Sequence, residues 1–272
     1  MALLGLLLLT LIYLRGAQGD TPNLVLFSVD DEIVSEAWQA AYYDTIQSSG
    51  ISNPNGCKPP ITWFTSKGPD RGDCDTALLA YSAGHELATH TVTHPELPGL
   101  SYDEITAEVA GQREWLIDCG IPAEAITGFR APYYKTDDTV TQVLIDLGVQ
   151  YDSSKADDSP TQQAYSTGSL WEVPAYTLPG GDRRSDPQPE DGMSVLERLQ
   201  AAFESKRGSG APVSILVHEP CKLSNRDDIV AFLSWAFAQD NTWGITYQQY
   251  ISWLEAGAGD IASVLSNYTC GS

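Results

Sequence analysis

The sequence predicts an α/β fold in which helices surround a parallel sheet that closes into a barrel. Short apolar, β-branched runs alternate with helical patterns along nearly the whole chain, and this alternation is typical of successive βαβ units. The 272 residues are 42% hydrophobic, which suffices for the core of one large domain. No internal repeat or low-complexity linker divides the chain, so we expect a single domain.

The predicted strands are short apolar runs with the length and β-branching of buried strands. The first, LVLFSV, and a later one, VSILV, show this most clearly. Pro174 indicates an end or a sheet edge within its run, because proline cannot donate to a ladder. We expect strands at residues 24–29, 61–65, 127–130, 170–176, 213–217 and 244–247.

The predicted helices lie between these strands and are recognised by apolar spacing and by caps. Ser101 with Glu104, and Ser194 with Glu197, form capping boxes that mark two helix starts. Gly148 follows an i, i+3, i+4, i+7 pattern and should end that helix. We expect helices near residues 33–47, 76–81, 101–116, 140–147, 194–203 and 229–236, and a last one that ends near 255.

The N-terminal stretch MALLGLLLLTLIYLRGAQG, residues 1–19, is interpreted as a secretory signal peptide. Its apolar run, Ala2 to Leu14, is too short to span a bilayer comfortably. Ala17 and Gly19 are small residues at the −3 and −1 positions of a cut before Asp20. The alternative is a signal anchor that stays in the membrane. We expect a secreted, extracellular protein of residues 20–272, with no stable membrane insertion after cleavage.

The chain is strongly acidic, with a formal net charge of −21. Such a protein is not suited to binding nucleic acid through its phosphates, and anionic polymers would be repelled. We therefore expect a neutral or cationic partner.

All five cysteines follow the predicted cleavage site, and disulfides are the default in an exported protein. Their odd number leaves at least one thiol without a partner in the chain. In a barrel, Cys57 before its strand and Cys270 after the last helix would both lie at the bottom face. This placement predicts a disulfide between them. Asn267 begins a glycosylation sequon.

Polar or titratable side chains stand directly after several of the apolar runs. The carboxyl ends of parallel strands meet at one rim, where the active sites of barrel enzymes lie. Each side chain alone has an ordinary explanation, such as a helix N-cap for paired aspartates, but those explanations predict no common location. The residues are Asp30, Asp31, His90, His94, Arg130 and His218.

These residue types suit metal-dependent hydrolysis. Two imidazoles and one carboxylate fill three positions of a tetrahedral site and leave the fourth for water. His90 and His94 would point the same way on one helical turn, or on a loop that leads into it. One of the two aspartates can bind the metal while the other stays free as a base, and His218 can act as an acid. The sequence contains no serine-hydrolase elbow, P-loop or dinucleotide fingerprint.

Four motifs in order make the chain resemble the polysaccharide deacetylases, carbohydrate esterase family four, over about residues 23–255. SVDD at 28–31 corresponds to the family's T-F-D-D motif, and LVH at 216–218 to its L-x-H motif. HTVTH at 90–94 and RAPY at 130–133 match their motifs fully. The stretches at 53–57 and 151–154 further resemble the chitin deacetylases of eukaryotes.

The resemblance implies a distorted (β/α) barrel with about seven strands and a divalent metal, zinc or another such as Co²⁺. It implies that Asp31, His90 and His94 hold the metal. It also implies that Asp30 is the general base and that Arg130 holds and tunes this carboxylate.

On the substrate side, the resemblance implies that His218 is the general acid toward the leaving amine. Tyr133 is expected to line the groove, where its backbone N–H helps to stabilise the oxyanion. Leu216 is expected to line the pocket for the acetyl methyl group.

The family's fourth motif, D-x-x-D-W, is missing from the sequence. The nearest candidate is Trp171-Glu172 on a predicted strand. We expect Trp171 to contact substrate and Glu172 to face the far nitrogen of His218, because an imidazole near a dication needs an anion to stay protonated. His85 precedes a predicted strand rather than following one, and we expect it to be structural.

The activity that the resemblance implies is removal of N-acetyl groups from chitin or chito-oligosaccharides, with release of acetate, by residues 20–272. The alternatives are O-deacetylation of acetyl xylan and a catalytically weak, carbohydrate-binding matrix protein. The partner would be chitin or another N-acetylated polysaccharide, and peptidoglycan is disfavoured by the negative charge. We expect a monomer. The loop at 179–192 is expected to border the cleft.

Overall fold

The structure is a computed structural model, and it describes residues 21–68, 70–180, 186–268 and Cys270. The predicted signal peptide, residues 1–19, lies outside the described residues. Within the described ranges, no helix is both long enough and apolar enough to cross a membrane.

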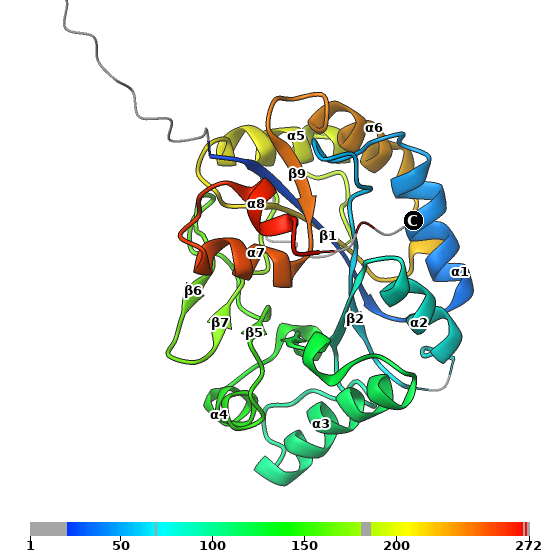
Figure 1. The fold of residues 1–272 in the computed structure, drawn as a ribbon, viewed down its shortest axis with the longest axis vertical. Coiled ribbons are helices and arrows are strands. Elements are labelled where there is room, and N and C mark those ends of the chain that lie inside the picture. The colour runs from blue at the N-terminus through cyan, green and yellow to red at the C-terminus, as the bar shows by residue number, and fades with distance from the viewer. Residues whose placement is uncertain (1–20, 69, 181–185, 269, 271–272) are drawn as a thin grey trace, which may run out of the picture.

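A curled, mostly parallel sheet forms a half-barrel at the centre of the molecule, which confirms the predicted fold class (Figure 1). The strand order is β6-β7-β5-β4-β3-β2-β1-β8, and β9 also pairs with β1. The short β6 runs antiparallel to β7, whereas the other pairings are parallel, so the described sheet has eight parallel strands rather than about seven. The strands are β1 Asn23–Asp31, β2 Thr62–Thr65, β3 Glu86–Thr89, β4 Gly128–Phe129, β5 Tyr151–Asp152, β6 Tyr165–Ser166, β7 Trp171–Glu172, β8 Val213–Val217 and β9 Thr242–Ile245.

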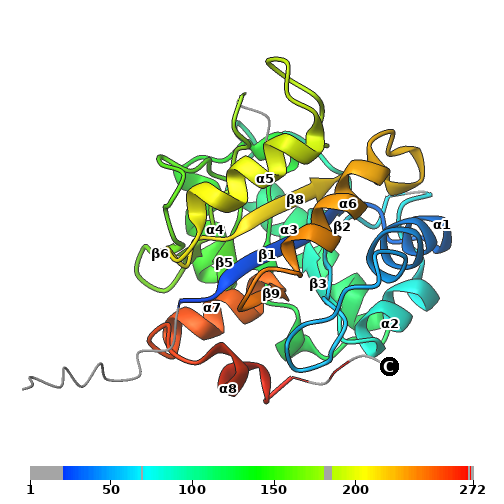
Figure 2. The same cartoon turned by 90° about the horizontal axis from the view of Figure 1, so that it is seen from above.

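Helices cover the outside of this sheet. The helices α5 and α6 flank β8, and α3 and α4 lie together at the opposite end of the molecule (Figures 1 and 2). The α-helices are α1 Ser35–Trp38, α2 Cys74–Ser82, α3 Tyr102–Asp118, α4 Asp138–Asp146, α5 Val195–Lys206, α6 Arg226–Ala236, α7 Tyr247–Glu255 and α8 Ile261–Leu265. A π-helix, η1 Gln39–Gln47, continues α1, and short 3₁₀ turns lie at η2 Ala123–Ala125, η3 Pro132–Tyr134 and η4 Pro220–Lys222.

The central strand, β1, divides its side chains between two environments, because successive residues point to opposite faces of a sheet. Alternate residues of Val25–Val29 join the core shared with α1, α2, α5 and α6. Leu24 and Leu26 join a second cluster inside the half-barrel, which includes aromatic side chains of α7. By the same alternation Asp30 follows the inner row and Asp31 the outer row.

The local signals in the sequence correctly located several helix ends. Ser101 and Ser194 each accept a hydrogen bond from the third helical amide, and the glutamate at that position reaches back to the cap. Gly148 follows α4 with a φ of +68°, a conformation that glycine adopts without a steric penalty. The predicted helices around α2, α6 and α7 are also present.

Three strand predictions need correction. The predicted strand at 170–176 is reduced to the two residues of β7, and the one at 244–247 ends at Ile245, because Thr246 caps α7. The stretch directly after His85, which the expected strand ranges leave out, is strand β3. Its sequence, ELAT, contains residue types that are poorly represented in strands, so its pairing between β2 and β4 determines its conformation.

Two disulfides join distant parts of the chain. The predicted bond between Cys57 and Cys270 is present, with a Cα–Cα distance of 5.3 Å. A second bond joins Cys74, the first residue of α2, to Cys119 at the end of α3. Cys221 is exposed and free.

His85 is a structural residue, as predicted. It is buried, and its Nδ1 accepts a hydrogen bond from the Ile61 amide at 2.9 Å. Its ring packs edge-on against Trp38 and Tyr42. Burial lowers the pKa of His85 to about 3, so the ring is neutral and serves to join β2 to the α1–η1 segment.

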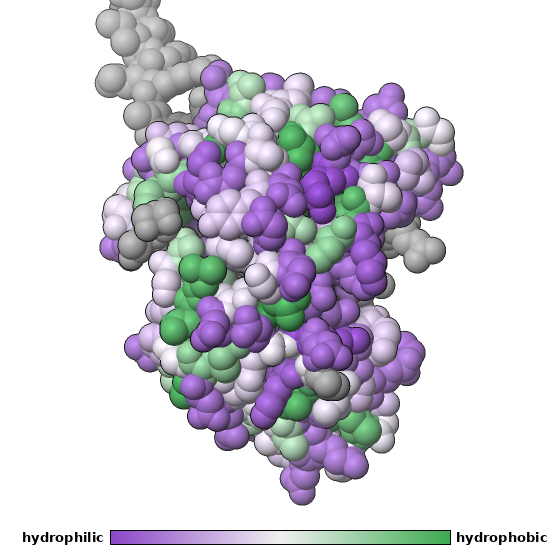
Figure 3. Space-filling view, turned by 90° about the vertical axis from the view of Figure 1, so that its right-hand side faces the viewer, coloured by the Kyte–Doolittle hydropathy of each residue, from purple (hydrophilic) through white to green (hydrophobic). Residues whose placement is uncertain are grey.

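One face of the molecule can be judged for apolar patches in the space-filling view. The face drawn in Figure 3 is mostly hydrophilic, with small apolar areas scattered over it rather than gathered into one patch. Scattered apolar residues of this kind are normal on a folded protein, so this face offers no broad apolar docking surface.

Candidate functional site

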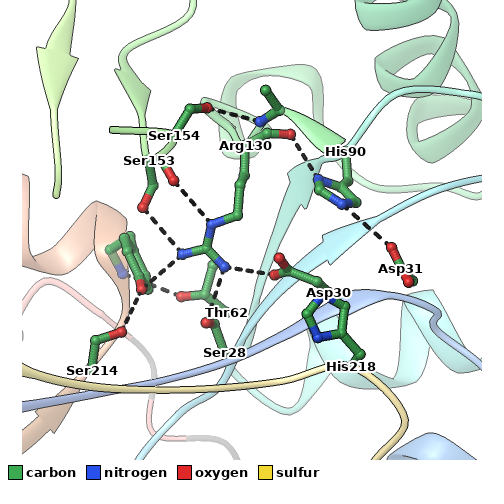
Figure 4. Close-up of polar contacts among 12 residues, drawn as sticks. Ser28, Asp30, Asp31, Thr62, His90, Arg130, Ser153, Ser154, Ser214 and His218 are labelled. Carbon is green, nitrogen blue, oxygen red and sulfur yellow. Dashed lines mark hydrogen bonds and ion pairs between the residues drawn. The ribbon is translucent and has the colours of Figure 1, made fainter. Parts of the chain in front are cut away.

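Asp30 lies inside the half-barrel at the end of β1 and forms a buried ion pair. Its Oδ1 accepts a hydrogen bond from Arg130 Nη1 at 2.6 Å (Figure 4). Both side chains are almost wholly excluded from solvent. Burial alone would lower the pKa of Arg130, but the charge of Asp30 outweighs it and raises that pKa. The guanidinium therefore stays charged and holds the carboxylate in one place.

The rest of the Arg130 guanidinium contacts neutral oxygens. Nη1 also donates to Ser28 Oγ at 3.3 Å, and Nε donates to the Ser153 carbonyl at 3.1 Å. Nη2 donates to Ser153 Oγ at 3.1 Å and to the Tyr247 hydroxyl at 2.9 Å. The guanidinium lies over the Phe64 ring, 3.9 Å from its centroid. Asp30 is thus the only carboxylate within hydrogen-bonding distance of Arg130 among the described residues.

Asp31 lies at the rim, beside two histidines. Its Oδ1 is 2.9 Å from His94 Nε2 and 3.4 Å from His90 Nε2. One donor atom from each of the three residues falls within 4.8 Å of the others. Burial would raise the pKa of Asp31, but hydrogen bonds and charge from the two histidines outweigh it and hold that pKa well below its usual range. The carboxylate is therefore ionised, as a metal ligand must be.

The tautomer of His90 follows from its second contact. Its Nδ1 lies 2.7 Å from the Arg130 carbonyl oxygen. A carbonyl can only accept, so Nδ1 carries a proton, and Nε2 is the nitrogen that faces Asp31 (Figure 4). An outer hydrogen bond of this kind is the usual support of a metal-binding histidine.

The rim is built from backbone in the left-handed region. Asp31, Thr91 and His94 have φ values of +75°, +69° and +62°, and such residues cost about 1–3 kcal/mol each. His90 follows strand β3 and His94 lies in the next loop. Of the two expected settings, a helical turn or a loop, the structure shows the loop, and strand and loop geometry bring the two rings to 5.0 Å between centroids.

Glu108 of α3 fixes the loop between the two histidines. Its Oε2 accepts hydrogen bonds from the amides of Val92 at 2.8 Å and Thr93 at 2.9 Å, and its Oε1 accepts from Thr93 Oγ1 at 2.6 Å. The His94 amide donates to Thr91 Oγ1 at 3.1 Å. These bonds offset the backbone strain and set the position of His94.

The residues present fit a divalent metal. Two imidazole nitrogens and a carboxylate are a common donor set for zinc. Asp31 Oδ1 is buried and lies close to Nε2 of His94 and of His90, so it is placed to bind the same ion as they do. Asp31, His90 and His94 would hold the ion.

His218 follows β8 and is paired with a carboxylate that the sequence did not reveal. Its backbone N–H donates to Asp186 Oδ1 at 2.8 Å, and its Nδ1 is 2.7 Å from Asp186 Oδ2. Burial lowers the pKa of His218, but the hydrogen bond that its Nδ1 donates to Asp186 and the charges of Asp30, Asp186 and Asp31 raise it to about 9. Figure 4 shows the His218 ring beside the Asp30 carboxylate. His218 is therefore protonated at neutral pH.

The prediction that Glu172 faces His218 is wrong. Glu172 lies on β7, whereas His218 follows β8, and these strands lie toward opposite ends of the sheet order. The strands β7 and β8 follow one another along the chain, but the half-barrel does not pair them, so they are not neighbours in space. Glu172 instead accepts a hydrogen bond from the Lys155 amide at 3.0 Å and pairs with the Lys155 ammonium at 3.5 Å.

Trp171 does not reach the Asp31 cluster. Its Nε1 donates to Glu255 at 3.0 Å, and the ring packs against the second core cluster. The prediction that Trp171 contacts substrate therefore has no support in its surroundings.

Tyr133 and Leu216 are the other two residues that were expected to line the substrate groove. Tyr133 is 58% exposed, and its ring lies 4.7 Å from the His94 ring, centroid to centroid. Its φ of +58° turns it out of the short helix η3. Leu216 is buried on β8, in the same row as Ser214, whose hydroxyl contacts Tyr247 inside the half-barrel. This row continues to His218.

Sequence reasoning missed four residues that support the site, namely Glu108, Ser153, Asp186 and Tyr247. Ser153 belonged to a stretch whose resemblance to chitin deacetylases was visible, and Asp186 to the loop expected to border the cleft. Glu108 and Tyr247 carried no signal, because an exposed helix face and a strand end explain them equally well.

Comparison with known proteins agrees with the fold described above. The sequence profile described as polysaccharide deacetylase matches residues 20–151. No curated protein sequence gave a significant match. At the identities given below, likeness to solved structures shows a shared fold.

Three solved structures illustrate that fold. A protein of Mycobacterium smegmatis assigned to the polysaccharide deacetylases has 18% sequence identity and a TM-score of 0.65, over 89% of this chain and 93% of its own. The chitin deacetylase of the fungus Colletotrichum lindemuthianum has 16% identity and a TM-score of 0.53, over 83% and 85%. The peptidoglycan deacetylase PdaC of Bacillus subtilis has 14% identity and a TM-score of 0.57, over 92% and 99%.

The fold and the matched sequence define a carbohydrate deacetylase domain of the half-barrel type. The chain carries a polysaccharide deacetylase domain, which the family profile matches over residues 20–151. Members of this family generally use a divalent metal, and the cluster of Asp31, His90 and His94 is a possible site for one.

Proposed function

We propose that this protein is a secreted, metal-dependent deacetylase that removes N-acetyl groups from chitin or chito-oligosaccharides and releases acetate. One observation carries the proposal. The Asp31–His90–His94 cluster stands next to Asp30, whose carboxylate Arg130 holds in place, and next to His218, whose raised pKa keeps it protonated, so a candidate base and a candidate acid flank the residues that could hold a metal.

The chain's own residues would bind and orient the reactants. Asp31, His90 and His94 hold the ion, and a bound zinc or similar cation such as Co²⁺ would polarise the acetyl carbonyl and acidify water. The exposed Tyr133 ring offers a sugar ring a flat apolar surface beside His94. Leu216, inside the rim, supplies apolar surface for the acetyl methyl group.

Asp30 acts as the general base. Its Oδ1 is held by Arg130, so the carboxylate does not turn away from the rim, and the proton of the attacking water passes to it. The neutral oxygens around the rest of the guanidinium keep Arg130 in place without competing for its charge.

His218 acts as the general acid. Deacetylation must expel an amine, and an amine leaves as a neutral molecule only after it gains a proton. Asp186 keeps His218 protonated, with Nδ1 toward the carboxylate and Nε2 free to deliver its proton to the leaving nitrogen. An alcohol leaves an ester more readily than an amine leaves an amide, so an ester needs less help from a general acid. The strong anionic partner of His218 therefore favours the amide substrate over acetyl xylan.

Charge and disulfides support the substrate and the location. A net charge of −21 does not oppose a neutral acetylated polymer, and it attracts the amino sugar that deacetylation produces. Two disulfides are typical of a protein that has been exported. We propose that it acts outside the cell as a monomer.

The test is acetate release from chitin oligomers and from acetylated xylan, with and without a chelator. We expect chelator-sensitive release from chitin oligomers, restored by zinc. Release from xylan alone would reassign the substrate, and release that ignores the chelator would contradict the metal-dependent mechanism. The Asp30→Asn variant serves as the inactive control.

A further inference from the structure

Arg198 of α5 is a fully buried cation outside the site described above. Its side chain is 0% exposed. Nε donates to the Pro179 carbonyl at 2.8 Å, Nη2 donates to the Leu178 carbonyl at 3.4 Å, and Nη1 donates to the Gln188 carbonyl. Nη2 also pairs with Glu190 at 3.2 Å. A buried charge with this many partners needs an explanation, because desolvation makes it costly.

The partners of Arg198 belong to two segments. Leu178 and Pro179 form the first segment. The second is residues 186–190, which we call the Asp186 arm. One guanidinium thus joins the two segments, with donors aimed at carbonyls on both. A lysine could not do this, because its ammonium lacks the planar fork of donors.

The Asp186 arm carries the carboxylate that holds His218. The Asp186 amide donates to the Leu216 carbonyl at 2.8 Å, which attaches the arm beside the last residues of β8. The Asp186 carboxylate then reaches the amide and Nδ1 of His218. Gln188, which Arg198 binds, is only two residues further along the chain.

The arm has few backbone bonds of its own. Pro187 and Pro189 have no N–H to donate, so side chains must fix the arm through its carbonyls. Asn225 Nδ2 donates to the Pro187 carbonyl at 3.2 Å, and Arg198 donates to that of Gln188. Of these two side chains Arg198 is the buried and charged one, and hydrogen bonds from charged groups are the stronger.

We propose that Arg198 is a positioning residue for the general acid, which it serves by holding the Asp186 arm so that the Asp186 carboxylate stays on His218. This inference rests on the proposed function, in which His218 donates the proton. Arg198 contacts neither His218 nor the metal cluster, and it acts through the arm.

The helix α5 provides a matched control. Lys206 is a second buried cation on this helix, and it donates to the Pro160 carbonyl, outside the Asp186 arm. Lys206→Met therefore removes a buried charge from the same helix without touching the arm. It should leave turnover and the pH profile as they are in the wild type.

The test compares Arg198→Lys, Asp186→Asn and the double variant in the full-length, metal-loaded enzyme. We expect Arg198→Lys to lower kcat about tenfold, a fraction of the 10²–10⁴ that a general acid contributes, with KM unchanged. The charged groups that face His218 are Asp186, Asp30 and Asp31. A loosened Asp186 should move the basic limb of the pH–rate profile to lower pH.

The double variant separates positioning from a purely structural role. If Arg198 acts through Asp186, adding Arg198→Lys to Asp186→Asn should have little further effect on kcat. Additive losses, or a basic limb that stays in place in Arg198→Lys, would overturn the proposal. Glu190→Gln, at a half-buried side chain, weakens the same contact more gently and should show the same direction and the same non-additivity. If Arg198→Lys does not fold, Glu190→Gln tests the role of Arg198 in its place.

A readout without substrate keeps this test independent of the proposed function. The His218 amide donates to Asp186, so its hydrogen exchange reports directly on the arm. We expect faster exchange at His218 in Arg198→Lys but not in Lys206→Met. Equal protection in both variants would refute the role of Arg198, whereas absence of acetate release from the wild type would refute only the proposed function.

Discussion

Asp30 and Asp31 are adjacent and chemically identical, yet they lie in opposite kinds of environment. Asp30 faces the inside of the half-barrel, buried against a charged arginine that neutral oxygens hold on its other sides. Asp31 has a left-handed φ at the rim, where its side chain is 23% exposed and contacts two histidines. The alternation of a β-strand is enough to separate them. One sequence motif can therefore supply both a base and a metal ligand.

The two regions are also supported differently. The inner region is supported by strands, since Ser28 lies within β1 and Arg130 and Ser153 directly follow β4 and β5. The rim is supported by side chains that fix loops, namely Glu108 for the histidine loop and Asp186 for His218. We expect changes in the inner region to affect chemistry at constant metal content, and changes at the rim to affect metal binding or proton supply.

The largest effect should come from Asp30→Asn. The amide cannot take a proton from water, so kcat for acetate release should fall about 10²–10⁴-fold. Arg130 would lose the anionic partner that the described residues give it, so thermal unfolding must be measured in parallel to show that the variant is folded at the assay temperature. Turnover within threefold of the wild type would mean that another group is the base.

Glu108→Gln should have the next largest effect. Its carboxylate orients the loop that carries His94, and loss of an outer-shell contact of this kind lowers metal affinity about 10–100-fold. A competition titration with a fluorescent zinc chelator measures this change. Glu114→Gln, which removes an exposed carboxylate from the same helix, is the control and should bind zinc as the wild type does. Unchanged affinity in Glu108→Gln would show that His94 needs no such support.

The smallest effect on turnover should come from Asp186→Asn. Asp186 raises the pKa of His218, and the acid form is lost as the pH rises through that pKa. Removal of the carboxylate lowers the pKa, so the basic limb should move to lower pH, with kcat about tenfold lower at pH 8. Asp191→Asn removes the same charge nearby and should change neither. If both variants keep the wild-type basic limb, Asp186 does not govern the acid.

The sequence was informative where chemistry follows directly from a strand end. Asp30, Asp31, Arg130 and His218 could be predicted to converge because the carboxyl ends of parallel strands share one edge. Spacing alone did not show that His90 and His94 meet across a loop, since i, i+4 spacing is also typical of a helical turn.

The sequence was uninformative where a contact depends on which strands are neighbours in the sheet or on where a loop packs against it. Glu172 was chosen because its strand precedes that of His218 in the sequence, but the sheet separates β7 from β8. The actual partner, Asp186, precedes Pro187 and Pro189 in a segment with no regular pattern. Its position depends on tertiary contacts with β8 and Arg198, which no local rule predicts.

The most direct test of the division between Asp30 and Asp31 is the zinc content of Asp30→Asn and Asp31→Asn, measured by elemental analysis after loading and removal of excess metal. We expect Asp30→Asn to retain as much zinc as the wild type while losing turnover, and Asp31→Asn to lose the zinc, because two histidines alone do not complete the site. Equal zinc in the two variants would contradict the assignment of one aspartate to the proton and the other to the metal.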